Sequence, residues 1–137
     1  ANHEGVDLYN SNQNQVDVSV FSAINGEVVY VRLRCESNTQ FSKNENLREC
    51  GAGWGNHIVI KHLSGIYTRY VHLRLDGIFK VVGDQVMQSD IIGLMGNSGR
   101  SEERHLHFEI GIYDGVFDSC GPAQSFDKVF DPIDYGI

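Results

Sequence analysis

The rhythm of short apolar runs broken by turn-forming residues constrains this chain most, because helical periodicity is hard to find anywhere in it. The runs are rich in β-branched and aromatic residues, and several alternate apolar with polar side chains, as half-buried strands do. Many short strands at close spacing favour an all-β fold, mainly antiparallel, arranged as a sandwich or a barrel. Strands are predicted at 16–21, 26–34, 55–62, 66–73, 79–86, 91–96 and 105–113.

The length of 137 residues suits one domain, and no internal repeat or linker divides the chain. A single domain over 1–137 is therefore expected. Two segments interrupt the strand rhythm. A polar stretch at 36–49 is expected to loop over the surface, and 114–137 is expected to form an irregular tail with one helical turn near 123–129.

Charge and hydropathy exclude two classes of partner. The formal net charge is -7, whereas nucleic-acid and anionic-membrane surfaces need clustered Lys and Arg. No apolar run approaches the ~20 residues that a membrane-spanning helix requires. Neither a nucleic-acid partner nor a membrane span is expected.

Three cysteines bear on the cellular compartment. Cys35 and Cys50 bracket the polar stretch, where a disulfide would close a loop of about 15 residues and contribute ~3 kcal/mol in the chain-entropy model. Such a bond indicates an oxidising, secreted or periplasmic setting, and the alternative is two free thiols in a cytosolic loop. The disulfide is the favoured reading, and it leaves Cys120 free.

Two histidines stand one residue apart in the run HLHFEI. Because residues i and i+2 of a strand share a face, His105 and His107 point the same way and Glu109 shares their face. The opposite face carries the apolar side chains of Leu106, Phe108 and Ile110. Two imidazoles beside an acid on one face favour chemistry over packing. Glu109 either orients a histidine or points to solvent, and it is not counted as a site residue.

The stretch NHEGVD supplies His3 and Asp7, two ordinary zinc-ligand types that form a weak signal alone. The helical H-E-x-x-H reading is rejected, because a glycine sits mid-motif and the fifth residue is Asp. His72 closes a predicted strand on the same face as Tyr70, and taken alone it is more often a half-buried structural histidine.

Two more histidines lie on another predicted strand. His57 and His62 differ in parity, so they face opposite sides of the sheet, and structural roles are expected for both.

Together these residues resemble the lysostaphin/LytM-type zinc metallopeptidases of the M23 peptidase family over nearly the whole chain. The motifs occur in the family's order: H-x-G-x-D at 3–7, a G-N-x-x-V-x-x-H-like spacing at 55–62, Y-x-H-L at 70–73, V-G-D-x-V at 82–86, I-G-x-x-G-x-S-G at 92–99, H-L-H-F-E at 105–109 and D-P-x-x-Y at 131–135. One departure is Glu103-Arg104, which stands where the family commonly has Gly-Pro.

The resemblance implies a duplicated-hybrid-motif-like β fold with a narrow groove, and one Zn²⁺ per chain. The implied metal ligands are His3, Asp7 and His107, and the implied catalytic residues are His72 and His105. Zinc would activate a water, with His105 as general base and acid and His72 as a hydrogen-bond donor to the oxyanion.

The implied substrate is the peptide part of bacterial peptidoglycan, either a cross-link or a bridge, hydrolysed by a monomer in the periplasm or the cell envelope. The alternative is a non-catalytic module of the same fold that binds cell-wall peptide or regulates another hydrolase. All five implied positions are occupied, which favours the enzyme.

Overall fold

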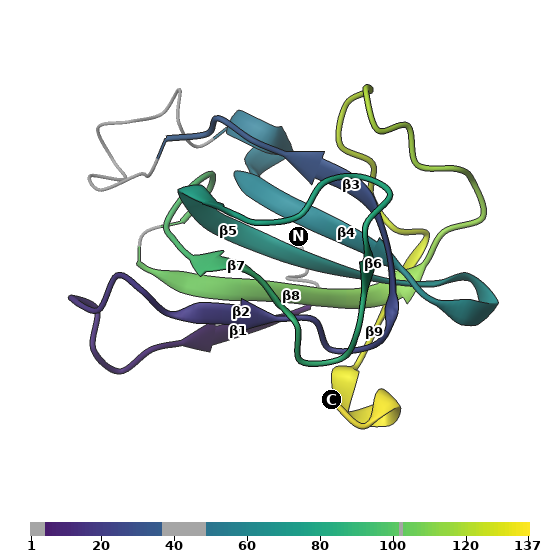
Figure 1. Ribbon diagram of the computed structural model, residues 1–137, viewed down its shortest axis with the longest axis horizontal. Helices are drawn as coiled ribbons and strands as arrows, with labels where there is room; N and C mark the ends of the chain where they lie inside the picture. Colours follow the sequence, from purple (N-terminus) through teal and green to yellow (C-terminus); the bar gives the residue numbers. More distant parts are fainter. Residues whose placement is uncertain (1–4, 37–48, 102) are drawn as a thin grey trace.

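Nine antiparallel strands form one curved sheet in the computed structural model, which describes residues 5–36, 49–101 and 103–137 (Figure 1). The strands are β1 (Val6–Tyr9), β2 (Ser19–Phe21), β3 (Gly26–Arg32), β4 (Asn56–Lys61), β5 (Ile66–Ile78), β6 (Gln85–Val86), β7 (Ile91–Met95), β8 (His105–Ile112) and β9 (Lys128–Phe130). Short 3₁₀ turns occupy Cys50–Gly53, Leu63–Gly65 and Pro132–Tyr135. The predicted all-β, mainly antiparallel fold is confirmed. In the described part of the chain no helix is long and apolar enough to cross a membrane.

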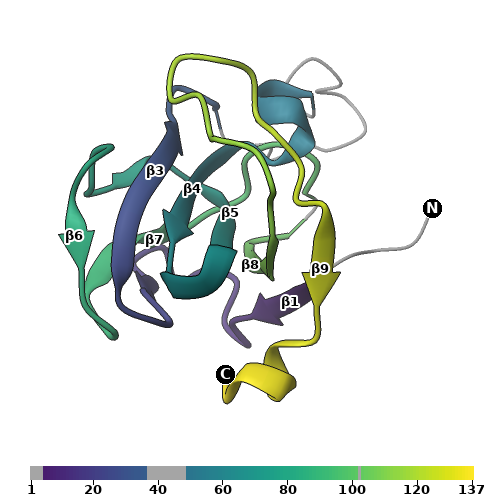
Figure 2. The ribbon, with the colours of Figure 1, turned by 90° about the vertical axis from the view of Figure 1, so that its right-hand side faces the viewer.

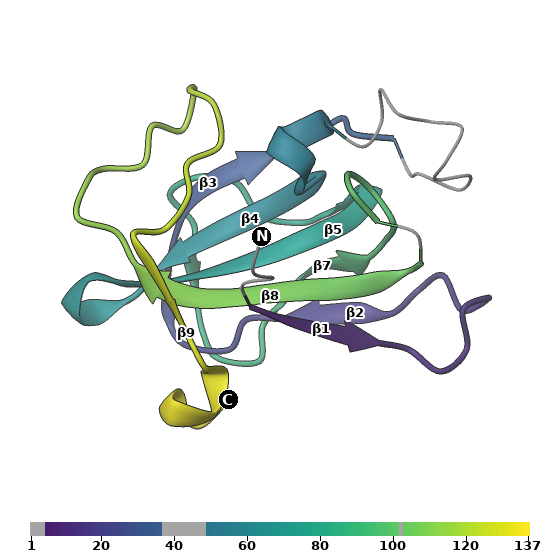
Figure 3. The same ribbon diagram turned by 180° about the vertical axis from the view of Figure 1, so that it is seen from behind.

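The long strands β5 and β8 lie side by side at the centre of the sheet. The strand order is β1-β8-β5-β4-β3-β6, with β7 joined to β5, β2 joined to β7, and β9 joined to β8. Seen from the side, the sheet curves so that β3 and β6 stand opposite β1 and β9 (Figure 2). One edge of β8 pairs with β5, while the other pairs first with β1 and then with β9 (Figure 3). Strand β8 is therefore held from both sides.

The two faces of the central strands carry separate apolar clusters. The larger cluster includes Ile58, Tyr70 and Phe108, all of them buried. Alternation along β5 places Tyr67 on the opposite face from Tyr70. The smaller cluster, on the Tyr67 face, consists of Tyr30, Val59, Tyr67, Phe117 and Phe126. The smaller cluster therefore covers only part of the Tyr67 face, and the polar residues of β8 lie on the rest of it.

The strand predicted at 79–86 is wrong over most of its length, since only Gln85–Val86 is a strand. The preceding residues form a turn, in which the Asp84 carboxylate accepts a hydrogen bond from the Val81 N–H at 2.9 Å. Gly83 has a φ of 99° in the same turn. The aspartate and the glycine favour the turn more strongly than the β-branched residues favour a strand.

The helical turn predicted near 123–129 is also wrong. Residues 128–130 form β9, which pairs with the end of β8, and Phe126 packs into the smaller apolar cluster. Residues 113–127 contain neither helix nor strand, in agreement with the predicted irregular tail, although Phe117 and Phe126 are buried in the smaller apolar cluster. The strand β1 was not predicted either, because four residues give too short an alternation to detect.

Cys35 and Cys50 form a disulfide with a Cα–Cα distance of 5.8 Å, and Cys120 is free and exposed. Most of the insertion predicted at 36–49 lies outside the described residues.

Candidate active site

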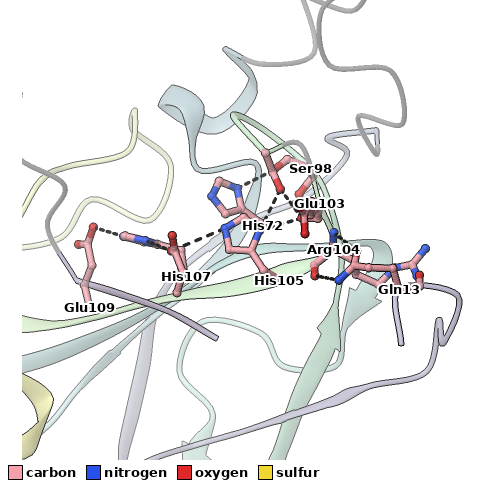
Figure 4. Close-up of polar contacts among 10 residues, drawn as sticks. Gln13, His72, Ser98, Glu103, Arg104, His105, His107 and Glu109 are labelled. Atoms are coloured by element: carbon pink, nitrogen blue, oxygen red, sulfur yellow. Dashed lines mark hydrogen bonds and ion pairs between the residues drawn. The ribbon is translucent and has the colours of Figure 1, made fainter. Parts of the chain in front are cut away.

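Strand β8 carries the polar face that its alternation predicts. His105, His107 and Glu109 are all buried, with exposed fractions of 7%, 6% and 5%, and they lie in a row (Figure 4). Their neighbours Leu106, Phe108 and Ile110 belong to the larger apolar cluster on the other face. Burial of polar groups costs free energy unless they have partners, so each of these side chains needs one.

Asp7 on β1 lies opposite His107 in the antiparallel register. Its Oδ1 atom is 2.8 Å from Nδ1 of His107 and 3.6 Å from Nε2 of His105. Gly5 lets β1 approach this closely, because it has a φ of 88° and a Cβ atom there would lie 2.5 Å from the Phe108 carbonyl oxygen. The glycine of H-x-G-x-D therefore allows the close strand packing that places Asp7 beside His107.

His107 lies between two carboxylates. Glu109 Oε1 is 3.0 Å from Nε2 of His107, on the side of the ring away from Asp7. Burial lowers the pKa of His107, but the hydrogen bonds with Glu109 and Asp7 outweigh it and raise the pKa overall. Glu109, which sequence reasoning left out of the site, thus contacts the key imidazole. The sequence did offer a signal for this contact, because Glu109 is two residues after His107 and so lies on the same face of the strand.

The donor atoms fit a metal ion as far as they are described. Asp7 Oδ1 and His107 Nδ1 converge, and a carboxylate on the remote nitrogen of a ligand histidine is a common supporting contact. His3, the third predicted ligand, lies outside the described residues. Within the described ranges no group of three His, Cys, Asp or Glu side chains is assembled to hold a metal.

His72 reaches the same face from β5. Its ring centroid is 4.8 Å from that of His105 and 6.1 Å from that of His107. The prediction that it shares a face with Tyr70 is wrong, because Tyr70 packs on Phe108 in the core. A φ of 64° at His72 and a shift of register between β4 and β5 break the alternation at this point.

The tautomer of His72 follows from its partner. Its Nδ1 is 2.6 Å from the Ser98 carbonyl oxygen, which only accepts, so Nδ1 carries the hydrogen and Nε2 has the lone pair. Burial, followed by repulsion from His105, lowers the pKa of His72 to about 3. The ring is neutral at neutral pH, and its Nε2 accepts hydrogen bonds rather than donates them.

Two further residues that sequence reasoning did not assign support His72. Asn56 donates from its backbone to Ser98 Oγ at 3.0 Å and from its side chain to the Leu73 carbonyl at 3.2 Å. Ser98 Oγ donates to the same Leu73 carbonyl at 2.7 Å. Both residues have 0% exposure. They come from the G-N and G-x-S-G motifs, so the signal was present in the sequence without an assigned role.

The other two histidines lie outside this cluster, in agreement with the structural roles expected of them. His62 contacts the Asn25 carbonyl at 2.7 Å and Thr68 Oγ1 at 2.8 Å. His57 contacts the Gly55 carbonyl at 2.8 Å and stacks on Tyr30.

Known protein families and solved structures resemble this chain in sequence and in fold. The model of peptidase family M23 matches residues 1–119, and the chain therefore belongs to that family. The catalytic domain of lysostaphin from Staphylococcus simulans superposes with a TM-score of 0.65 at 24% identity, covering 97% of this chain and 77% of that one. A zinc-containing peptidase from Vibrio cholerae superposes with a TM-score of 0.58 at 28% identity, covering 88% and 30%.

Among curated relatives, the peptidoglycan DD-endopeptidase ShyA of Vibrio cholerae is 43% identical over 56 residues, which is 41% of this chain and 13% of ShyA. The first curated relatives are much longer proteins, and the match spans 16% or less of their length.

Proposed function

We propose that the chain is a zinc-dependent endopeptidase that hydrolyses peptide bonds in bacterial peptidoglycan cross-links or bridges. The carrying observation is the convergence of Asp7 and His107 beside two imidazoles, those of His72 and His105, on one face of an M23 sheet. Similarity to ShyA, a peptidoglycan DD-endopeptidase, supports the proposed substrate. Similarity to the zinc-containing peptidase of Vibrio cholerae supports the proposed metal.

The proposed metal ligands are the Asp7 carboxylate and Nδ1 of His107, with His3 of the same H-x-G-x-D motif as the third. A bound zinc ion would lower the pKa of a water towards ~7 and polarise the scissile carbonyl. Glu109 accepts the Nε2 hydrogen of His107, which would leave the lone pair of Nδ1 for the metal ion that the Asp7 carboxylate also binds.

His105 is the proposed general base and acid. Its Nδ1 is 2.8 Å from the Glu103 carbonyl oxygen, so the hydrogen of the neutral ring lies on Nδ1. The free Nε2, on the Asp7 side of the ring, accepts a proton from the attacking water and later returns it to the leaving amine. Loss of such a group typically lowers the rate by about 10²- to 10⁴-fold.

His72 has a more restricted role than a simple hydrogen-bond donor. In the neutral tautomer its Nε2 accepts, which suits a water O–H or a substrate N–H. Stabilisation of the oxyanion from this nitrogen therefore requires that His72 first gain a proton. A lost oxyanion donor typically lowers the rate by about 100- to 1000-fold.

An oxidising location accompanies this function. Peptidoglycan lies outside the cytoplasm, and the Cys35–Cys50 disulfide suits the periplasm or the cell envelope.

Zinc content and cell-wall digestion test the proposal together. The purified protein is expected to bind one zinc per chain by native mass spectrometry and to release soluble peptide from purified cross-linked peptidoglycan. His107→Ala is expected to lose both properties. A zinc-loaded protein that sediments with peptidoglycan yet releases no peptide would instead support the non-catalytic binding module.

A further inference from the structure

The loop after β1 is tied to the residue that precedes His105. The ladder between β1 and β8 ends with Tyr9 opposite His105, and a further antiparallel step would place residue 10 opposite Arg104. The Gln13 side chain takes that place. Its Oε1 accepts from the Arg104 backbone N–H at 2.8 Å, and its Nε2 donates to the Arg104 carbonyl at 2.8 Å. A carboxamide offers the same donor and acceptor as a peptide, so Gln13 adds one more pair to the ladder.

Arg104 completes the connection from its own side chain. Its guanidinium donates to the backbone carbonyls of Gln13 and Gln15, the second at 3.2 Å. These bonds join segments 89 to 91 residues apart in the sequence, and the two side chains lie beside His105 (Figure 4). Hydrogen bonds from a charged donor are about twice as strong as neutral ones. We call this set of four hydrogen bonds the Gln13–Arg104 clasp.

The clasp and His105 share one peptide plane. The N–H of Arg104, held by Gln13, and the C=O of Glu103, which accepts from Nδ1 of His105, belong to the same planar peptide unit. Orienting one end of this unit therefore orients the other. The hydroxyl of Ser101 donates to the same Glu103 carbonyl at 2.7 Å and lies 3.1 Å from Nδ1 of His105.

The faces of the His105 ring are occupied by other residues. Tyr9 stacks on it with ring centroids 5.1 Å apart, and His72 approaches at 4.8 Å. These contacts set the plane of the ring but do not choose which nitrogen carries the hydrogen. Among the hydrogen bonds described at Nδ1, the Glu103 carbonyl makes that choice, because it can only accept.

We infer that Gln13 is a positioning residue for His105: through the 103–104 peptide it holds the Nδ1–H tautomer, which leaves Nε2 free as the base. This rests on the proposed function only in the role given to His105. It also gives a role to Glu103-Arg104, the departure from Gly-Pro, since a proline at 104 would have no N–H to donate to Gln13.

The direct test is the tautomer of His105, observed by long-range ¹H–¹⁵N correlation NMR and assigned with His105→Gln. The wild type is expected to show the hydrogen on Nδ1. Gln13→Ala and Arg104→Pro are expected to show a mixture of tautomers, whereas Asn14→Ala, an exposed change in the same loop, should match the wild type. Gln13→Glu keeps the acceptor for the Arg104 N–H and should retain the wild-type tautomer. An unchanged tautomer in both Gln13→Ala and Arg104→Pro would overturn the inference.

Kinetics supply a second readout. Gln13→Ala is expected to lower kcat on a peptidoglycan peptide by about 10-fold with KM unchanged, less than the ~100-fold that a 1 Å displacement can cause. Gln13→Glu should restore most of that loss. An equal loss in Gln13→Glu and Gln13→Ala would count against the peptide-plane argument. If the wild type hydrolyses nothing, the proposed function fails, while the NMR comparison still decides the clasp.

Discussion

His107 has a carboxylate at each ring nitrogen, and this arrangement determines what the imidazole can do. With Glu109 on Nε2 and Asp7 on Nδ1, the ring can donate to Glu109 and keep its other nitrogen for a cation. Glu109 itself pairs across the strands with Arg69, which has 0% exposure and whose pKa burial lowers to about 10. A buried guanidinium therefore lies opposite Glu109 on the neighbouring strand.

Replacing Glu109 tests this support. Glu109→Gln removes the negative charge that accepts the His107 hydrogen, and we expect zinc affinity to fall by about 10- to 100-fold. The measurement is a competition titration against a zinc chelator. Glu27→Gln, a change at an exposed position away from the site, serves as the matched control and should leave the affinity unchanged. Equal affinities in Glu109→Gln and the wild type would mean that Glu109 does not orient the ligand.

His57 gives a pH-dependent prediction outside the proposed site. Burial lowers its pKa to about 3, so below pH 6.5 the unfolded chain binds a proton that the folded chain does not. Its contribution to stability is complete above pH 6.5 and is lost as the pH falls towards 3. Between pH 7.5 and 5 we expect the wild type to lose about 2 kcal/mol through this residue.

Urea unfolding at the two pH values checks this expectation, with His57→Gln for comparison. The variant should be less stable at pH 7.5 but should lose about 2 kcal/mol less than the wild type on acidification. Identical pH dependence in the two proteins would show that the His57 pKa is not depressed.

At the scale of elements, strand alternation placed the site residues of β8 correctly but placed His72 of β5 on the wrong face. The period of two placed His105, His107 and Glu109 on a common face without any tertiary information. It placed His72 with Tyr70, because alternation assumes a regular backbone. The positive φ at His72 coincides with the shift of register between β5 and β4, and no local pattern in the sequence encodes it.

Other elements follow the same division. The hairpin strands β4 and β5 could be predicted from their own residues, while β9 and the segment holding Phe117 and Phe126 depend on an apolar cluster assembled from distant strands. Asn56 and Ser98 carried motif signals, but their contact with each other and the support of His72 required the fold.

The close approach of β1 to β8 predicts the effect of changing Gly5. A Cβ atom there would lie 2.5 Å from the Phe108 carbonyl and 2.9 Å from Glu109 Cγ, so Gly5→Ala should displace β1 and Asp7. We expect zinc affinity to fall by at least 10-fold, comparable to losing a supporting contact of a ligand. Isothermal titration calorimetry with zinc measures it.

Gly65→Ala is the matched control for that change. Gly65 also has a positive φ, 73°, but nothing lies within 4 Å of its added Cβ. This variant should lose about 1–2 kcal/mol of stability from backbone strain and keep its zinc affinity. Similar zinc affinities in both variants would show that the approach at Gly5 does not place Asp7.

At the scale of the whole molecule, the disulfide links the segment after β3 to the 3₁₀ turn before β4, and Cys35 also contacts Asn56, which supports the site. Asn56 exchanges hydrogen bonds with the Cys35 backbone at 2.8 and 2.6 Å, and the same residue holds Ser98. The double change Cys35→Ser and Cys50→Ser should lower the free energy of unfolding by about 3 kcal/mol, because it releases a loop with a sequence separation of 15.

Guanidinium unfolding measures that difference, with Cys120→Ser as the control, since Cys120 is exposed and free. The control should retain wild-type stability. A double variant as stable as the wild type would mean that the disulfide contributes nothing to the folded state.

The central claim is that His105 moves a proton during peptide hydrolysis without holding the metal. The most direct measurement compares the initial rates at which the wild type and His105→Ala, both loaded with one zinc, cleave a cross-linked muropeptide dimer followed by mass spectrometry. We predict that the wild type produces two fragments that together gain one water, and that His105→Ala keeps its zinc and loses about 10²- to 10⁴-fold in rate. Cleavage by His105→Ala at the wild-type rate, or loss of its zinc, would contradict the account.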